Sequence, residues 1–509
     1  MKFVGIAFLG CVGLIACSSA NPSTGSNGNP SGEGNTGNFG GSGNTGNTGG
    51  AGNTGNFGGV GNTGNSGGVG NTGNSGGIGN TGNFGGAGNV GNTGNSGGSA
   101  DTGGTTNVGG SGDTGNTGGA GNTGGSATGG TTAAGGSPNE PPVVAGCGSA
   151  QIYQADADPG KPGPWPVGVK TVKVSITGGT IPVEVWDPAT YGSDAGKTPA
   201  SYDLTAWLGA SSAALIPASA NAPAVCDFTK LGEGKCYRDL PIDTNHGPYP
   251  VVIFIHGTGS FRVASMSTMV AWASHGFIVL AADHPGLFLS DFLGTGCGAS
   301  TGIAQDLSRD VDAEIAAVNG KVGDLSFLGT AADTSRYAIS GHSQGASNAA
   351  TFASKPNMMV DMPFADLGGT AAAGSALKAV LLAGGASDSV VPYSSDQGAY
   401  TSSVAAQKYL VGITAGNHLD VTDLCWQTNS SGQTAIAVAN KYLTCSATLP
   451  ILDALAQCGT MPDPTKGPAI VNYTSTAVLE QTLNCVDRTA AFNNLKTEFP
   501  QVSDFEHTP

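Results

Sequence analysis

A short motif at residues 341–345, with the sequence GHSQG, matches the pattern Gly-x-Ser-x-Gly. This pattern is typical of a sharp turn between a strand and a helix, which strains the serine backbone and exposes its hydroxyl. A serine hydroxyl is a weak nucleophile until a base accepts its proton and an acid orients that base. The motif therefore predicts that Ser343 is a nucleophile and that the backbone N–H of Gln344 stabilises an oxyanion.

The base that would serve Ser343 is predicted from chain order. On this type of turn the nucleophile, the acid and the base follow one another along the chain. Only two histidines, His418 and His507, come after residue 343. His507 lies in what reads as a loose tail, a poor place for a positioned side chain, whereas His418 follows the apolar run 409–413. We therefore predict His418 as the base.

The acid is predicted from its place at the end of a buried strand. Asp388 lies in the segment 384–392, GGASDSVVP, directly after the apolar run 379–383. A carboxylate there could fix the tautomer of the imidazole and stabilise the imidazolium. Four rival aspartates follow no strand end so directly: Asp366, Asp396, Asp420 and Asp423.

A second oxyanion donor is expected in the loop after the first long apolar strand. Residues 256–260, HGTGS, follow the apolar run 251–255, and the N–H of Thr258 is the predicted donor. His256 and His342 lie beside the two turns. We interpret both as buried scaffold residues rather than as a second base.

The elements that must position these residues follow from hydrophobic periodicity. Residues 167–176 alternate as an antiparallel strand does, with 181–186 as partner. Continuous apolar runs predict buried strands at 251–255, 277–282, 337–340 and 379–383. Helices are expected at 265–274, 305–318 and 346–353. Apolar strands that alternate with helices predict an α/β fold with a mostly parallel central sheet and helices on both faces.

Two further motifs resemble known families. Residues 256–262, HGTGSFR, and 274–279, SHGFIV, resemble the platelet-activating-factor acetylhydrolase family. The serine motif and the Asp388 segment are similar to cutinase-like polyester hydrolases, and the resemblance spans residues 160–425. It implies an α/β-hydrolase fold and hydrolysis of carboxylic esters through an acyl-enzyme, without a metal or organic cofactor.

The resemblance has limits that bear on the substrate. Polyester hydrolases usually place a substrate-gripping tryptophan between the nucleophile and the acid, and residues 344–387 contain none. Small-molecule or lipid-like esters are therefore expected rather than polymers. The insert around Cys226 and Cys236 and the tail from Cys425 to Cys485 lie outside the matched motifs. Whether this tail forms a lid or covers a sheet edge stays open.

The N-terminal part predicts export and attachment to a membrane. Residues 1–16 carry one lysine and a short apolar run, typical of a signal peptide. The run ends in LIAC, which resembles a bacterial lipobox with Cys17 as the acylated residue. Ser18 follows, which by resemblance to enterobacterial sorting indicates the outer membrane or cell surface. We expect an envelope lipoprotein held to the membrane through lipidated Cys17.

A repeat tract separates this anchor from the catalytic part. From Gly34 the chain repeats a nonapeptide, GNTGNxGGx, that carries Asn and Thr where a calcium-binding β-roll needs Asp. Residues 17–146 are therefore interpreted as a lipidated cysteine and a flexible spacer, followed by a hydrolase domain at 147–509. An adhesin whose repeat is the active part remains an alternative, as does an amidase or peptidase with the same triad.

The net charge and the number of cysteines indicate which partners and which cellular compartment to expect. The 509-residue chain has a net charge of −16 and no basic cluster beyond its N-terminus, so nucleic acid is not an expected partner. Eight cysteines follow Cys17, an even number that favours disulfides in an exported protein. Cys226 and Cys236 are close enough to close one loop, and the other pairings stay open. No CxxC spacing predicts a metal site.

Overall fold

The computed structural model describes residues 140–220, 223–297, 301–369, 376–429, 431–443 and 455–508. The chain divides into two units, Met1–Thr128 and Gly129–Pro509, and the described residues belong to the second. The predicted signal peptide, Cys17, Cys445 and the spacer up to residue 139 lie outside the described residues.

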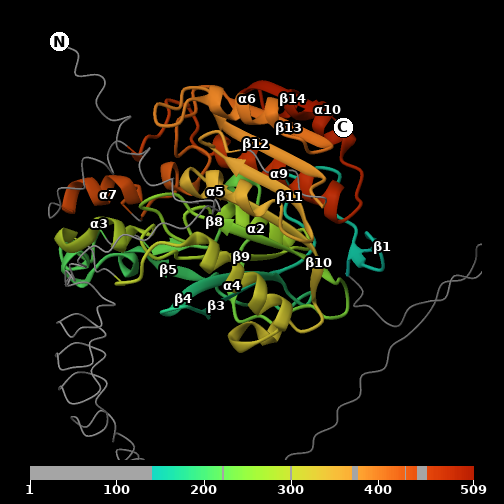
Figure 1. Ribbon diagram of the computed structural model, residues 1–509, viewed down its shortest axis with the longest axis horizontal. Helices are drawn as coiled ribbons and strands as arrows, with labels where there is room; N and C mark the ends of the chain where they lie inside the picture. The colour runs from blue at the N-terminus through green and yellow to red at the C-terminus, as the bar shows by residue number, and fades with distance from the viewer. Residues whose placement is uncertain are drawn as a thin grey trace, which may run out of the picture. The chain divides into compact units, whose positions relative to one another are not determined.

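Ten of the described strands form one sheet across the domain (Figure 1). The strands in chain order are β1 (Val143–Ala145), β2 (Gln151–Tyr153), β3 (Val167–Ile176), β4 (Gly179–Pro188), β5 (Ser201–Asp203), β6 (Pro223–Val225), β7 (Cys236–Arg238), β8 (Tyr249–Ile255), β9 (Ile278–Ala282), β10 (Ala332–His342), β11 (Met358–Phe364), β12 (Ala379–Gly385), β13 (Gln407–Ile413) and β14 (Val502–Thr508). The large sheet has the order β14-β13-β12-β11-β10-β8-β9-β4-β3-β7.

Within this sheet a parallel centre is flanked by antiparallel pairs. The strands from β9 through β8 and β10 to β13 run parallel, whereas β4 is antiparallel to β9 and to β3. In the sheet β9 lies next to β4 and β8 lies next to β10, so the order of β8 and β9 is reversed relative to the chain. This reversal is the strand order of an α/β-hydrolase fold. The mostly parallel sheet predicted from the apolar runs is thus confirmed.

Helices cover both faces of the sheet, as the sequence predicts. They are α1 (Ala210–Ala213), α2 (Met266–Ser274), α3 (Leu289–Cys297), α4 (Leu307–Gly320), α5 (Gln344–Phe352), α6 (Tyr393–Ser402), α7 (Ala435–Tyr442), α9 (Lys466–Leu483) and α10 (Thr489–Glu498). Both faces of the sheet are covered because strands such as β8 carry apolar side chains on both sides. Val252 and Phe254 belong to the core that includes α2, α9 and α10, and Val251, Ile253 and Ile255 belong to the core that includes α4 and α5.

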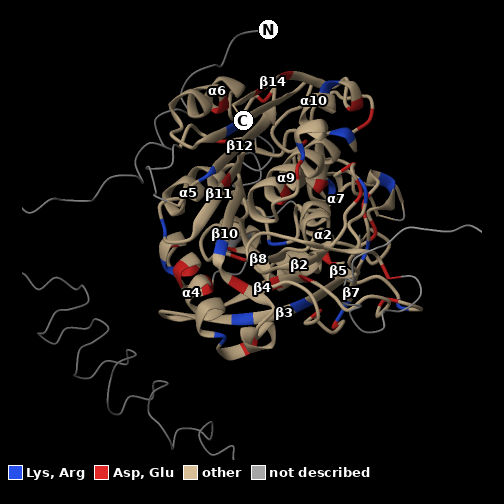
Figure 2. Ribbon diagram, turned by 90° about the vertical axis from the view of Figure 1, so that its right-hand side faces the viewer, with Lys and Arg blue, Asp and Glu red and all other residues tan. Residues whose placement is uncertain are grey.

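The C-terminal tail is part of the sheet and its cover. Helix α9 is buried along most of its length and packs against α2 (Figure 2), β11 and β12. Strand β14 then pairs antiparallel with β13, so the prediction of a loose tail around His507 is wrong. The ring of His507 stacks on Tyr409 and Phe505 at this edge. No helix among the described residues is long and apolar enough to cross a membrane.

Three disulfides close loops within the described residues. The predicted pair Cys226–Cys236 is confirmed, and Cys147–Cys485 joins the start of the domain to the end of α9. Cys425–Cys458 closes the segment that contains α7. Because disulfides persist in oxidising compartments, these bonds indicate an exported protein.

Candidate active site

Ser343 lies at the joint between β10 and α5, with a backbone φ of 56° and ψ of −120°. A positive φ is strained for any residue with a side chain, and it turns the hydroxyl out of the sheet. Glycine is required on both sides of this turn because neighbouring backbone leaves no room for a side chain. A Cβ at Gly341 would lie 2.5 Å from the backbone of Gly345, and a Cβ at Gly345 would overlap the carbonyl of Ile255.

His418 brings the nucleophile and the predicted acid together. It follows β13, and its Nε2 lies 3.0 Å from Ser343 Oγ. Its Nδ1 lies 2.9 Å from Asp388 Oδ2, so the N–H at this position donates to the carboxylate and leaves Nε2 free to accept the serine proton. The side chain is buried, and the three residues form one continuous hydrogen-bonded chain.

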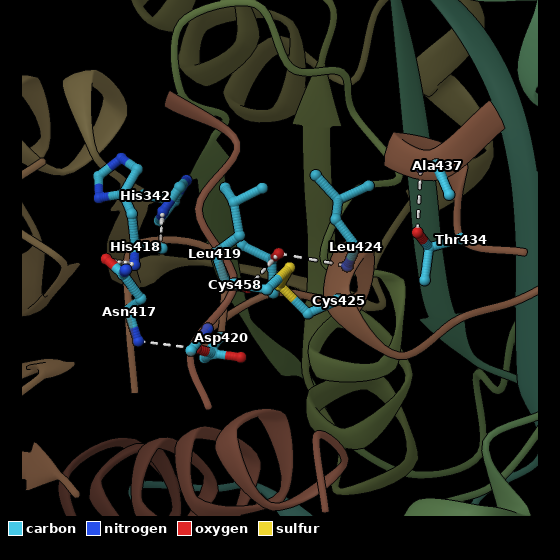
Figure 3. The surroundings of a disulfide bond; sticks show 12 residues. His342, Asn417, His418, Leu419, Asp420, Leu424, Cys425, Thr434, Ala437 and Cys458 are labelled. Carbon is cyan, nitrogen blue, oxygen red and sulfur yellow. Dashed lines mark hydrogen bonds between the residues drawn. A yellow bond between two sulfur atoms is a disulfide. The ribbon is translucent and has the colours of Figure 1, made fainter. Parts of the chain in front are cut away.

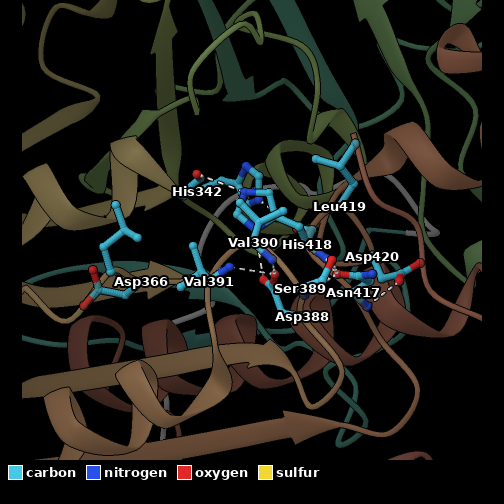
Figure 4. Close-up of polar contacts among 12 residues, drawn as sticks. His342, Asp366, Asp388, Ser389, Val390, Val391, Asn417, His418, Leu419 and Asp420 are labelled. Carbon is cyan, nitrogen blue, oxygen red and sulfur yellow. Dashed lines mark hydrogen bonds and ion pairs between the residues drawn. The ribbon is translucent and has the colours of Figure 1, made fainter. Parts of the chain in front are cut away.

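Asp388 is itself held at both carboxylate oxygens (Figure 4). Oδ1 accepts the N–H groups of Val390 and Val391 at 2.7 and 2.8 Å, and Oδ2 faces His418. The rival aspartates bond elsewhere: Asp366 to Ser347, Asp396 to the N–H of Asp366, Asp420 to the N–H of Asn417, and Asp423 to Ser267. Asp388 is the carboxylate that the described contacts place on the imidazole.

Asn417 joins the acid loop to the base loop. Its Oδ1 accepts the N–H of Ser389 at 2.8 Å and that of His418 at 2.9 Å. Its own N–H donates to Asp420, whose carboxylate also accepts the N–H of Gly459. This role of Asn417 was not predicted from the sequence. The only feature of the sequence that points to it is the position of Asn417 directly before His418.

His342 supports the base from beneath. Its Nε2 donates to the carbonyl of His418 at 2.9 Å, and the two ring centroids are 4.8 Å apart. Burial first, and then the charge that His418 can carry, lower the pKa of His342 to about 3. The ring is therefore neutral near pH 7, consistent with the scaffold role that the sequence predicts.

The predicted oxyanion loop lies against the nucleophile. A Cβ at Gly257 would come within 3.2 Å of Ser343 Cβ, and Thr258 lines the same cavity as Ser343. His256 Nε2 accepts the N–H of His284 at 3.2 Å, so its Nδ1 carries the proton and donates to the Gly257 carbonyl at 2.8 Å. Burial first, and then His284, lower the pKa of His256 to about 3. Gln344 is the first residue of α5.

A cavity of about 120 Å³ opens in front of Ser343 and His418. Its walls are mainly apolar: Phe261, Leu289, Leu419, Leu424, Ala435, Ile436, Ala439, Leu455 and Ala456. Ala435, Ile436 and Ala439 belong to α7, and the disulfide Cys425–Cys458 ties this segment to the chain that follows His418 (Figure 3). The C-terminal tail contributes to the cavity and to the sheet. Helix α7 lines the cavity, α9 packs over the sheet, and β14 extends the sheet beyond β13.

Two comparisons find known proteins that are similar to this chain. A family model described as chlorophyllase matches residues 240–372, which include the oxyanion loop and the Ser343 turn. The strand order and the turn at Ser343 give this chain the α/β-hydrolase fold. The match covers less than half of the chain and shows similarity to that family over this segment. Among solved structures the chain is similar to a ferulic acid esterase from Streptomyces cinnamoneus, with 19% identity and a TM-score of 0.39 over 62% of this chain and 90% of that chain. A search of curated proteins finds no match.

The low pKa of His342 predicts that the folded protein loses stability in acid. Between pH 6.5 and about pH 3 the unfolded chain binds a proton at this position that the folded chain excludes. Acidification through this window therefore removes stability, by up to about 1.4 kcal/mol per pH unit. We expect the difference in free energy of unfolding between wild type and His342→Gln to shrink as the pH falls, measured by urea denaturation. A difference that stays constant or grows would contradict this assignment.

Proposed function

We propose that the protein hydrolyses carboxylic esters through an acyl-enzyme formed on Ser343. The observation that carries the proposal is the continuous chain from Ser343 Oγ to His418 Nε2, at 3.0 Å, and from His418 Nδ1 to Asp388 Oδ2, at 2.9 Å. Ser343, at one end of this row of hydrogen bonds, lies on a strained turn and faces a mainly apolar cavity. These are the geometric requirements of an activated serine nucleophile.

The reaction has two halves. Ser343 Oγ attacks the ester carbonyl while His418 Nε2 accepts the hydroxyl proton, and the Asp388 carboxylate stabilises the imidazolium. The tetrahedral intermediate collapses when the imidazolium protonates the departing alcohol, which leaves an acyl group on Ser343. Water, deprotonated by His418, then attacks this acyl group. The bond between the acyl carbon and Ser343 Oγ breaks, the imidazolium returns its proton to Oγ, and the acid leaves.

Thr258 and Gln344 are proposed to donate backbone N–H groups to the oxyanion. The N–H of Thr258 and the carbonyl of Gly257 belong to the same trans peptide and point in opposite directions. By holding that carbonyl at 2.8 Å, His256 also fixes the direction of the Thr258 donor before substrate binds. Donors that are oriented in advance contribute most of the stabilisation of developing charge.

The cavity favours an ester with an apolar substituent of modest size. Leucine, isoleucine, alanine and phenylalanine side chains form most of its lining, and its volume is about 120 Å³. The chlorophyllase model, which spans the oxyanion loop and the Ser343 turn, supports an esterase over an amidase. Small or short-chain esters are the proposed substrates.

We expect Ser343→Ala and Asp388→Asn to lower kcat/KM for p-nitrophenyl butanoate by about 10⁴-fold or more, because the first removes the nucleophile and the second favours the tautomer of His418 that cannot accept the serine proton. Ser387→Ala is the matched control, since Ser387 is exposed and adjacent to Asp388. A fluorophosphonate should label wild type and Ser387→Ala but not Ser343→Ala.

The same assay separates the alternatives. A matched anilide should turn over far more slowly than the ester, whereas equal turnover would favour an amidase. Absence of labelling in wild type, or equal labelling of Ser343→Ala, would refute a serine hydrolase and favour an adhesin.

We also propose that the enzyme is a bacterial envelope lipoprotein anchored through Cys17 and separated from the membrane by the repeat spacer. The three described disulfides support export. The finer location, at the outer membrane or the cell surface, follows from Ser18 alone.

Metabolic labelling with a fatty-acid analogue tests the anchor. Wild type and Cys11→Ala should incorporate the label and enter the detergent phase, whereas Cys17→Ala should do neither, because Cys11 lies inside the removed signal. Labelling of the Cys17→Ala protein would refute the anchor.

A further inference from the structure

A second apolar cavity lies behind one wall of the catalytic cavity. It has a volume of about 80 Å³, and Thr205 is its one polar lining residue. Its other lining residues are Leu204, Leu208, Ile216, Ala220, Phe261, Leu289, Ala435, Val438, Ala439 and Leu443. Four of these also line the catalytic cavity: Phe261, Leu289, Ala435 and Ala439. The two cavities therefore share a wall, and Phe261 is its largest side chain.

Phe261 is held firmly in this wall. Its ring stacks on Trp207, with centroids 5.0 Å apart and an interplanar angle of 25°. Trp207 ends the 3₁₀ helix η4 (Leu204–Trp207), and its Nε1 donates to Asp283 Oδ2 at 2.8 Å. The guanidinium of Arg262 lies over the Trp207 ring at 4.9 Å and also pairs with Asp283. The position of the Phe261 ring is thus fixed by a buried charged pair rather than by apolar contact alone.

We propose that Phe261 is a specificity-determining residue that limits the length of the aliphatic chain carried by the ester. This inference rests on the proposed esterase function. With the phenylalanine ring in place, a chain that extends from the carbonyl at Ser343 meets the wall. Without the ring, the chain continues into the second cavity, where each buried methylene improves binding about fourfold. The shared wall and the second cavity are lined almost entirely by apolar side chains, which suits an alkyl chain.

The test compares chain-length profiles rather than activity on one ester. One series varies the acyl chain in p-nitrophenyl esters from butanoate to dodecanoate, and the other varies the alcohol in alkyl acetates. Phe261→Ala should raise the ratio of kcat/KM for the longest to the shortest member at least about tenfold in one series. The series that responds identifies whether the acyl or the alcohol chain enters. Phe261→Leu, a milder truncation, should raise the same ratio less.

A second substitution tests whether the change in the chain-length ratio depends on the second apolar cavity. Val438 is buried on α7 and lines the second cavity but not the catalytic one. Adding Val438→Phe to Phe261→Ala should refill the second cavity and return the ratio towards that of wild type. Ala437→Phe is the matched control, because Ala437 is exposed on the same helix and lines neither cavity (Figure 3).

The outcomes separate failure of this inference from failure of the esterase. Unchanged profiles in both series, in variants that fold and react with fluorophosphonate, would overturn the role of Phe261. A gain that persists in the Val438→Phe double variant would overturn the second cavity as the receiving site. If wild type hydrolyses no ester and resists labelling, the proposed function itself fails. Thermal unfolding of each variant reports folding independently of either result.

Discussion

The conformation of Ser343 requires that three backbones meet at one point of the sheet: the end of β10, the start of α5 and the loop after β8. A serine at φ 56° costs on the order of 1–3 kcal/mol, which surrounding structure must offset. That compensation comes from β10, buried between β8 and β11, and from α5, which packs against β10 and β11. Gly341 and Gly345 permit the approach, since a Cβ at either would collide with backbone.

The remaining parts of the site are held by loops that brace one another. Asn417 connects the acid loop to the base loop, His342 supports the base from below, and His256 orients the peptide above the nucleophile. Each of these groups is neutral and satisfies backbone groups. In the proposed reaction, negative charge develops on the substrate oxygen beside the two backbone donors, and positive charge develops on His418 next to Asp388.

Much of this arrangement is predictable from the sequence because it depends on local patterns. Apolar runs mark β8, β10 and β12, and the glycine spacing marks the turn at Ser343. Chain order limits the base to His418 and His507, and the apolar run before His418 favours His418. The strand at the C-terminus is not predictable in this way, because β14 has a mixed burial pattern and is defined by pairing with β13. Asn417, the lining by α7 and the wall at Phe261 depend on contacts between segments that are distant in sequence.

A crystal structure of the protein after reaction with an alkyl fluorophosphonate would show whether Ser343 is the nucleophile. This reaction places a covalent mimic of the tetrahedral intermediate in the site. We expect phosphorus bonded to Ser343 Oγ, with the phosphonyl oxygen about 2.7–3.1 Å from the N–H groups of Thr258 and Gln344. An adduct on another side chain, or a phosphonyl oxygen directed away from both donors, would contradict this expectation.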